Sequence, residues 1–412
     1  MGVQRCKGTR DLSPEEMTRF HLIEREFRVS CLMYGYDEVK TPVLEYLHLF
    51  TSAGTLTPTM LSKVYSFLDW DGWSGERVVL RPDVTIPVAR YFIENVKTQL
   101  AKLFYVANVF IFEETGEKTR ERWQCGAELI GMGSHLADVE LITLALEVLK
   151  ELGIENVELR LSHAGLIKGL LRKLDLSTDE QDRIFDRILD GDLEAWSWVR
   201  AEKPELEKTL APWLDLKGKS AGFIRNLASH FLQDLPDLKL QLDDFINIAE
   251  LLQNLGCDCQ IDITSVRGFE YYTGMIFQLF VGGEKIGGGG RYDDLIPAMG
   301  GGDIPASGFA LYVDQLMSLI KPQTQAKTET EKIFIRIESG NLEVLKEGFG
   351  IARHLRGAGY VVELDLGGKE IDGRRWKLSI QSKTPRFILN DRTKHKKHEA
   401  NTTDEIVGLL GC

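Results

Sequence analysis

The chain has 412 residues, of which 43% are hydrophobic and 27% charged, and its formal net charge is −12. This length and composition predict a globular protein with a sizeable core and two or three domains. No run of about 18 apolar residues offers a membrane span, and the charged start, MGVQRCKGTRDLSPEE, lacks the apolar core of a signal peptide. We therefore expect a soluble cytoplasmic protein that does not contact a membrane.

The cysteines are scattered and include no C-x-x-C pair. They stand at positions 6, 31, 125, 257, 259 and 412. This spacing indicates reduced cytosolic thiols rather than disulfides or zinc ligands. We expect no metal site and no cofactor.

The charge is unevenly distributed along the chain. Residues 331–412 hold 15 basic and 12 acidic residues, a net charge of +3, which leaves −15 for the remainder. The densest basic run is RTKHKKH, residues 392–398. Such a run is usually a solvated loop, although a basic stripe is also what a nucleic-acid binder needs.

The first residues predict a helix that starts at a capping box. In DLSPEE, Ser13 stands before Pro14, which suits the first helical turn, and Glu16 follows three positions after the serine. The side chains of Ser13 and Glu16 can accept hydrogen bonds from each other's main-chain N–H groups. Apolar positions recur at helical spacing until Gly35 ends the helix, and a strand follows.

Strands and helices then alternate up to residue 163. We expect a strand, a proline-bounded turn and a helix over 77–92, hairpin strands over 102–113 and 122–132, a helix over 135–153 and a strand over 156–163. The hairpin strands alternate apolar and polar residues, as in a half-buried sheet. The loop between them carries Lys118, Arg120 and Arg122, and this cluster suggests a grip for an anion.

The middle of the chain changes character. Strand signals vanish over roughly 165–255, where leucine and charged residues recur at helical spacing, so a helical insertion is predicted. Strands are expected again over 259–266, 271–281 and the glycine-rich 285–294, followed by a last helix over 308–320 and a polar linker over 321–330. A small α/β module follows, with strands over 332–337, 360–366 and 386–390 and helices over 342–359 and 402–411.

These motifs, in this order, resemble histidyl-tRNA synthetase. The stretches GTRDLSPEE, LRPDVTIPVAR, VRGFEYYTGMIFQLF and GGGGRYDDLIPAMGG carry the resemblance together with the hairpin, and it extends along nearly the whole chain. It implies an α+β fold: a class II aminoacyl-tRNA synthetase-like antiparallel sheet flanked by helices. We therefore expect a synthetase-like domain over 1–325, with the helical insertion at about 165–255, and an anticodon-binding-like α/β domain over 331–412.

The resemblance is lost where that family binds ATP. Active members carry an arginine after the phenylalanine of the first hairpin strand, which holds the α-phosphate of ATP and the carboxylate of histidine; here the residue is Ile111. A second arginine, on the last helix, holds the γ-phosphate, and here it is Gln315. Tyr312 replaces a glycine of the same pattern and should obstruct the adenine site. We expect no catalytic residues and no adenylation.

The family's histidine-binding positions are, in contrast, occupied by suitable residues: Asp83, Thr85, Gln124, Glu128, Arg267, Tyr271 and Tyr272. By resemblance, the first three hold the α-amino group, Glu128 with one of the two tyrosines holds the imidazole, and Arg267 is placed to pair with the carboxylate. Acidic and polar groups suit a ligand with an ammonium and a ring N–H. Two departures are the aspartate at position 83, where the synthetase usually has glutamate, and a slightly shorter hairpin loop.

Each of these residues also has a purely structural interpretation. Asp83 follows a proline and can cap the next helix. Gln124 and Glu128 lie on one face of a strand, and a solvated face would explain them equally well. The two tyrosines are also typical core aromatics, and the arginine can serve in a structural ion pair.

A synthetase-like chain with a histidine pocket but no ATP grip resembles the regulatory subunits of ATP phosphoribosyltransferase. That resemblance implies a non-catalytic partner of the short-form catalytic subunit in the first step of histidine biosynthesis, with histidine as a feedback effector. It also implies a hetero-oligomer with a homodimeric core formed by the first helix and the following strand.

A rival interpretation remains. Regulatory chains of this kind often stop near the linker, whereas this chain continues through residues 331–412. An authentic histidyl-tRNA synthetase, or a synthetase-derived RNA-binding protein, would use the basic run at 392–398 to contact tRNA. Ile111, Tyr312, Gln315 and the acidic main body argue against it, so we do not expect tRNA to be a partner.

Overall fold

The computed structural model describes residues 3–52, 61–69, 75–112, 119–172, 176–177, 180–181, 184, 217–218, 222–226, 236–262, 271–321, 332–338, 340–365 and 375–410. The chain forms two compact units, Met1–Lys321 and Pro322–Cys412. Most of the predicted helical insertion at about 165–255 lies outside the described residues, and so does Arg267.

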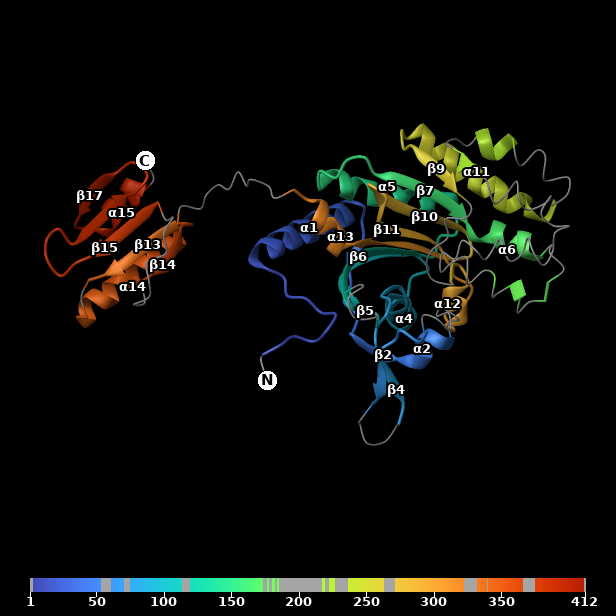
Figure 1. Cartoon of the computed structure of the whole chain (residues 1–412), viewed down its shortest axis with the longest axis horizontal. Coiled ribbons are helices and arrows are strands. Elements are labelled where there is room, and N and C mark those ends of the chain that lie inside the picture. The colour runs from blue at the N-terminus through green and yellow to red at the C-terminus, as the bar shows by residue number, and fades with distance from the viewer. Residues whose placement is uncertain are drawn as a thin grey trace. The chain divides into compact units, whose positions relative to one another are not determined.

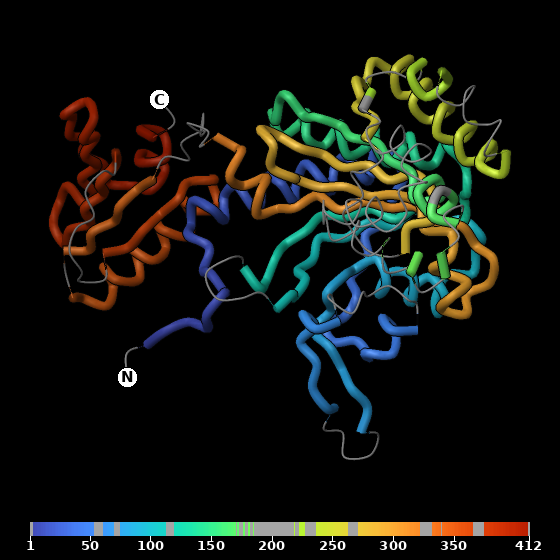
Figure 2. The backbone as a smooth tube through the Cα atoms, turned by 45° about the vertical axis from the view of Figure 1, so that its right-hand side comes forward, coloured from blue at the N-terminus to red at the C-terminus, as the bar shows by residue number. Residues whose placement is uncertain are grey.

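The first unit is built on a mostly antiparallel sheet. Nine strands of the described residues pair in the order β1-β5-β6-β12-β11-β10-β7-β9-β8. Their bounds are β1 Asp37–Glu38, β5 Ala101–Phe110, β6 Glu121–Ile130, β7 Glu158–His163, β8 Lys217–Gly218, β9 Cys259–Asp262, β10 Met275–Val281, β11 Glu284–Arg291 and β12 Ala306–Tyr312. Figure 1 labels β5, β6, β11, β10, β7 and β9 of this sheet. Because β6 pairs with both β5 and β12, the hairpin lies beside strands from the far end of the unit, as Figure 2 shows.

Helices cover both faces of this sheet (Figure 1). One face carries α1 Pro14–Met33, α5 His135–Glu151, α6 Ala164–Arg172, α11 Lys239–Asn254 and α13 Val313–Leu319, with the 3-10 turn η2 Pro236–Leu238 before α11. The other carries α2 Leu47–Ser52, α4 Thr85–Asn95 and α12 Leu295–Ala298. This arrangement agrees with the expected α+β architecture.

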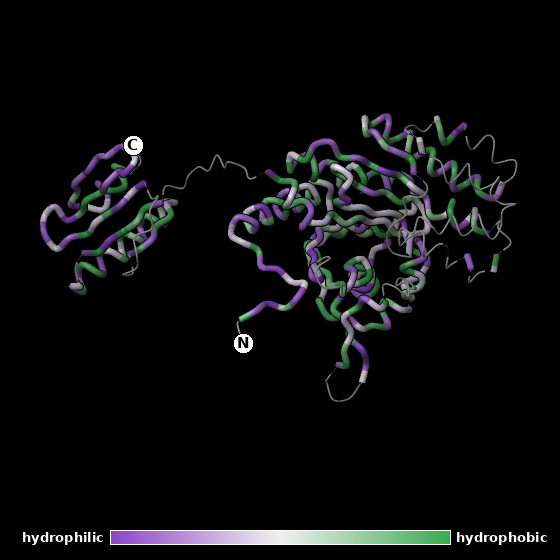
Figure 3. Tube along the Cα trace, in the orientation of Figure 1, coloured by the Kyte–Doolittle hydropathy of each residue, from purple (hydrophilic) through white to green (hydrophobic). Residues whose placement is uncertain are grey.

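Side-chain alternation along the strands separates two hydrophobic clusters. On β6, Cys125, Ala127 and Leu129 pack with α1 and α5, so Gln124 and Glu128 point to the opposite face, toward α4. Figure 3 shows pale stretches along the middle strands, where glycine and other small residues recur.

The predicted capping box is confirmed. Ser13 Oγ accepts a hydrogen bond from the N–H of Glu16 at 3.3 Å, and the N–H of Ser13 donates to Glu16 Oε2 at 2.8 Å. Both bonds satisfy N–H groups that the helix itself leaves without partners. The start of α1 is thus specified by four consecutive residues.

One helix was predicted too long. We expected a helix over 308–320, but residues up to Tyr312 form β12, and α13 begins only at Val313. Gly308 pairs with Glu128 on one side and with Gly290 on the other, so this segment completes the sheet. Hydrogen bonds to two neighbouring strands outweigh the local helical pattern.

A three-stranded sheet precedes α4 along the chain. It consists of β2 Leu44–Tyr46, β4 Arg77–Leu80 and β3 Ser66–Leu68, in the order β2-β4-β3. The sequence patterns did not predict β3. The chain leaves β4 through Arg81, whose guanidinium donates to main-chain oxygens of Thr41 and Asn108 at 2.9 Å each, and this anchors the turn that leads to α4.

The described residues of the second unit form a five-stranded sheet and two helices. The strands pair in the order β14-β13-β15-β16-β17. The elements are β13 Lys332–Ile337, α14 Leu342–Gly357, β14 Val361–Leu364, β15 Trp376–Ile380, β16 Phe387–Asp391, β17 Lys396–Ala400 and α15 Thr403–Leu410. The expectation that RTKHKKH is a loop was partly wrong, because Lys396–Ala400 pair with β16 as an edge strand.

Candidate functional site

A cavity lies on the glycine-rich face of the main sheet. The empty space at this site, counted together with the open solvent at its mouth, is about 540 Å³. Gly288 on β11, together with Gly308 and Ala310 on β12, lines its floor. These residues carry no side chain beyond Cβ, so the floor stays open between β10 and β6.

Five of the seven predicted histidine-binding residues line this cavity. They are Asp83, Thr85, Gln124, Tyr271 and Tyr272. They come from the turn before α4 and the first residue of α4, from β6 and from the segment before β10. The fold therefore brings together residues that lie far apart in the sequence.

Asp83 is buried at the start of α4. Its Oδ1 accepts a hydrogen bond from the N–H of Ile86 at 2.9 Å, so it also fulfils the capping role considered from the sequence. Burial raises the pKa of this carboxyl to about 6, although main-chain N–H groups and the hydroxyl of Tyr271 act in the opposite direction. One carboxylate thus serves both the helix and the cavity.

Glu128 lies immediately behind the cavity wall and is only 1% exposed, which excludes the solvated-face interpretation. Its Oε1 accepts from Thr85 Oγ1 at 2.8 Å, and its Oε2 accepts from the hydroxyl of Tyr292. Thr85 and Tyr292 line the cavity, whereas Glu128 contacts these two residues from behind. A Cβ on Gly308 would lie 1.7 Å from Glu128 Oε2, so the carboxyl group needs glycine opposite it.

Burial raises the pKa of Glu128 to about 8, opposed by hydrogen bonds from Tyr292 and Thr85 and increased by the nearby Asp83. Between its ordinary value of 4.5 and about 8, the folded chain holds a proton that the unfolded chain has lost. The stability that this bound proton contributes is fully present below pH 4.5 and is lost as the pH rises to about 8.

This linkage gives a testable pH dependence. The free energy of unfolding should fall as pH rises from 6.5 to 7.5, and Glu128→Gln should reduce that slope by about 1 kcal/mol per pH unit. Denaturant unfolding of both proteins at several pH values measures the slopes. Equal slopes in parent and variant would show that Glu128 does not titrate in this range.

Tyrosines enclose one side of the cavity. The ring centroid of Tyr271 lies 5.0 Å from that of Tyr272 and 5.3 Å from that of Tyr292. Burial raises the pKa of all three hydroxyls, which therefore stay protonated and able to donate. The rings also pack in the core cluster near α4, so the core-aromatic interpretation and the cavity-lining position both hold.

Three polar side chains that line the cavity were missed in the sequence analysis: Tyr105, Lys285 and Tyr292. Tyr292 follows Arg291 directly in the glycine-rich motif, and this adjacency was an available signal. Tyr105 pairs with Gly126, two positions from Glu128 on β6, so strand alternation predicts the face that it shares. Lys285 had no such signal.

The hairpin arginines make local contacts away from the cavity lining. The guanidinium carbon of Arg120 lies 4.4 Å from the ring centroid of Phe112, and a Cβ on Gly8 would lie 2.7 Å from the Arg120 side chain. The Nε of Arg122 donates to the carbonyl of Thr119 at 3.1 Å. Lys118 lies outside the described residues. At position 111, the main-chain N–H of Ile111 donates to the carbonyl of Arg120 at 2.9 Å.

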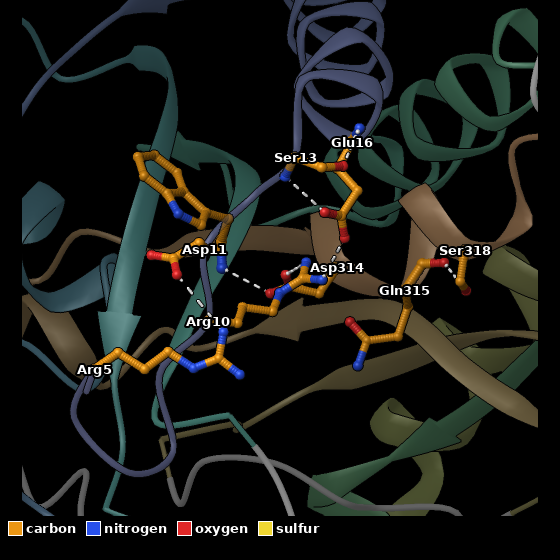
Figure 4. A network of polar contacts seen from close by, with 9 residues as sticks. Arg5, Arg10, Asp11, Ser13, Glu16, Asp314, Gln315 and Ser318 are labelled. Atoms are coloured by element: carbon orange, nitrogen blue, oxygen red, sulfur yellow. Dashed lines mark hydrogen bonds and ion pairs between the residues drawn. The ribbon is translucent and has the colours of Figure 1, made fainter. Parts of the chain in front are cut away.

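The start of α13 is held by a network shown in Figure 4. Arg10 donates to Asp314 and, at 3.1 Å, to Glu16, while Asp314 Oδ2 accepts from the N–H of Trp123 at 3.1 Å. The next residue is Gln315, whose main-chain carbonyl accepts from Ser318 Oγ at 2.6 Å. The network joins the N-terminal segment, β6 and α13 directly beside Gln315.

A buried ion pair supports the opposite side of the floor strands. Arg291 on β11 donates to Asp138 on α5 and, at 2.9 Å, to Asp244 on α11, and Ser307 Oγ donates to Asp138 at 2.9 Å. Burial raises the pKa of Asp138 to about 6, opposed by Arg291. This cluster fixes β11 and β12 against two helices and so holds the cavity floor in place.

The described helices include none that is long and apolar enough to cross a bilayer.

The chain is similar to known proteins along most of its length. The family model of histidyl-tRNA synthetase matches residues 8–316. The ATP phosphoribosyltransferase regulatory subunit of Dehalococcoides mccartyi is 50% identical over 409 residues, which cover 99% of this chain and 98% of that protein.

Authentic ligases and solved structures match as well. The histidine–tRNA ligase of Methanococcus maripaludis is 34% identical, over 90% of this chain and 88% of its own length. A solved structure from Bacillus halodurans, described as an ATP phosphoribosyltransferase regulatory subunit/histidyl-tRNA synthetase, superposes with a TM-score of 0.76 at 24% identity and covers 90% of this chain and 95% of its own. This likeness shows the fold, which is that of the class II synthetases.

Proposed function

The chain belongs to the ATP phosphoribosyltransferase regulatory subunits, a branch of the histidyl-tRNA synthetase family, and from this premise we propose that it senses histidine for its catalytic partner. It is the regulatory subunit of ATP phosphoribosyltransferase, which begins histidine biosynthesis in the cytoplasm. The partner is the short-form catalytic subunit, and histidine is the feedback effector.

The observation that carries the proposal is the cavity itself. It is lined by Asp83, Thr85 and Gln124, the family's positions for an α-amino group, and by the two tyrosines expected near an imidazole. Asp83 supplies negative charge in a buried place, where an ammonium ligand offsets the cost of burial. A free amino acid with a polar ring suits this lining.

The residues at the family's ATP-binding positions support a non-catalytic role. Ile111 and Gln315 provide no positive charge where the synthetases place arginines, and Tyr312 lines the cavity beside its cross-strand neighbour Gln124. Removing one preorganised donor for transition-state charge costs about 10²–10³ in rate. Two independent losses of this kind together lower the rate by about 10⁴–10⁶.

A pocket that binds histidine without consuming it can work as a sensor. Occupancy then shifts the equilibrium between two states of an assembly, and the coupling is reciprocal between effector and partner. We propose a hetero-oligomer whose core is a homodimer through α1 and β1. Leu32 and Met33, at the end of α1, are 60% and 83% exposed, and apolar surface of this kind favours burial against a second copy.

We propose no role in tRNA charging. Within the second unit, Lys396 and Lys397 are exposed on the edge strand β17. The turn before them has a local explanation, because Asp391 Oδ1 accepts from the N–H groups of Thr393 and Lys394 at 2.9 and 3.0 Å. The basic run therefore forms a structured turn and an edge strand, and lysines on an edge strand prevent its pairing with other chains. These roles explain the run without RNA binding.

Co-purification with a short-form catalytic subunit tests this function. The complex should form, phosphoribosyl transfer should rise on addition of this chain, and histidine should inhibit the complex. If the two chains do not associate, the regulatory function is refuted. If the complex is activated but is not inhibited by histidine, the sensing of histidine is refuted. A parallel filter-binding assay with histidine tRNA at about 0.15 M salt should show no specific retention.

A further inference from the structure

Lys285 places a positive charge at one end of the cavity. It stands near the start of β11, next to the register shift between Leu279 and Phe280 on β10. Its Cε lies 3.5 Å from the point where a Cβ on Gly288 would be, so the side chain runs along the glycine floor. Its ammonium is 6.0 Å from the ring centroid of Tyr312.

Among the described residues that line the cavity, Lys285 is the one cation and Asp83 the one carboxylate. All other polar groups of this lining are neutral hydroxyls or amides. Asp83 is buried, whereas Lys285 and Tyr312 are half-buried. The cavity therefore has an inner negative group and an outer positive group, a charge pattern that matches a zwitterion.

The position of Tyr312 shows where the Lys285 ammonium lies relative to the residues expected to hold the bound amino acid. It pairs across the strands with Gln124, one of the residues expected at the α-amino group. Lys285 therefore lies over the side of the cavity where the backbone end of an amino acid would be held, and not beside Glu128.

We propose that Lys285 binds the α-carboxylate of histidine in this cavity and so replaces the hairpin arginine that the chain lacks at position 111. This inference rests on the proposed function, since it names a specificity-determining residue of the same site. A lysine supplies charge without the fork that an arginine offers to both carboxylate and phosphate. The pocket then retains the amino acid and gives up the nucleotide.

A comparison of histidine with histidinol distinguishes carboxylate binding by Lys285 from a merely structural role of this residue. Histidinol keeps the imidazole and the ammonium of histidine but carries a hydroxymethyl group in place of the carboxylate. Lys285→Met should weaken histidine about tenfold and change histidinol less than about twofold. Lys285→Arg should restore most of the histidine affinity. Lys150→Met, at an exposed position on α5, is the control and should change neither ligand.

Calorimetry on the full chain distinguishes the outcomes. Equal weakening of both ligands by Lys285→Met, or weakening of neither, overturns the inference and leaves the proposed function standing. Absence of histidine binding by the parent chain overturns both. Arg267→Met provides a further arm, because the family resemblance assigns the carboxylate to that residue. If only Arg267→Met discriminates histidine from histidinol, the assignment to Lys285 is wrong.

Discussion

The purified chain should catalyse no histidine-dependent exchange between ATP and pyrophosphate. Adenylation needs positive charge on the α-phosphate and the γ-phosphate, and Ile111 and Gln315 supply none. The expected rate is about 10⁴–10⁶ below that of an active synthetase, which places it at background. Tyr312 adds a steric reason, since its ring lines the cavity next to Gln124.

Two controls make a negative result informative. Calorimetric titration of histidine into the same preparation shows that the chain is folded and that its pocket is competent. A combined Ile111→Arg, Tyr312→Gly and Gln315→Arg variant tests whether these positions are the cause, and exchange should rise above the parent level. Exchange by the parent at ordinary synthetase rates would instead identify the chain as an active ligase.

Asp83→Asn should weaken histidine binding at least tenfold. The asparagine oxygen can still accept the N–H of Ile86, so the start of α4 keeps its cap, while the negative charge facing the ligand's ammonium is lost. A hydrogen bond to a charged group contributes about 1.5–3 kcal/mol, and 1.4 kcal/mol corresponds to about tenfold in affinity. Glu128→Ala should have a comparable effect, since Glu128 holds Thr85 and Tyr292 in the cavity wall.

Inhibition of the assembled complex provides the second measurement. Because occupancy and inhibition are thermodynamically linked, the histidine concentration needed for half-inhibition should rise by the same factor as the dissociation constant. Asp258→Asn, at an exposed position before β9, should change neither value. If Asp83→Asn and Glu128→Ala both bind histidine like the parent, the cavity is vestigial and feedback must enter through the catalytic subunit.

The capping box illustrates what local sequence can specify. Ser13 and Glu16 are three residues apart, and their two hydrogen bonds need no other part of the chain. Hairpin strands and amphipathic helices follow from short periodic patterns in the same way. The motif order added the family, and with it the positions of the candidate site.

Residues 308–312 illustrate what local sequence could not specify. Their pattern favours a helix, yet β6 and β11 lie on either side and offer hydrogen bonds that only a strand can use. The contacts of Arg120 depend in the same way on Gly8 and Phe112. Partners distant in the sequence decided both cases.

The sequence by itself determined the family, many of the helices and strands and five of the cavity's side chains, because these depend on motifs and on near neighbours in the chain. Only the tertiary structure decided that Glu128 lies behind Thr85 and Tyr292, and that Lys285 reaches across the glycine floor toward Tyr312. The reason is physical: burial, pKa and the charge pattern of a cavity arise from cross-strand neighbours, and those neighbours are set by the pairing of β6, β11 and β12.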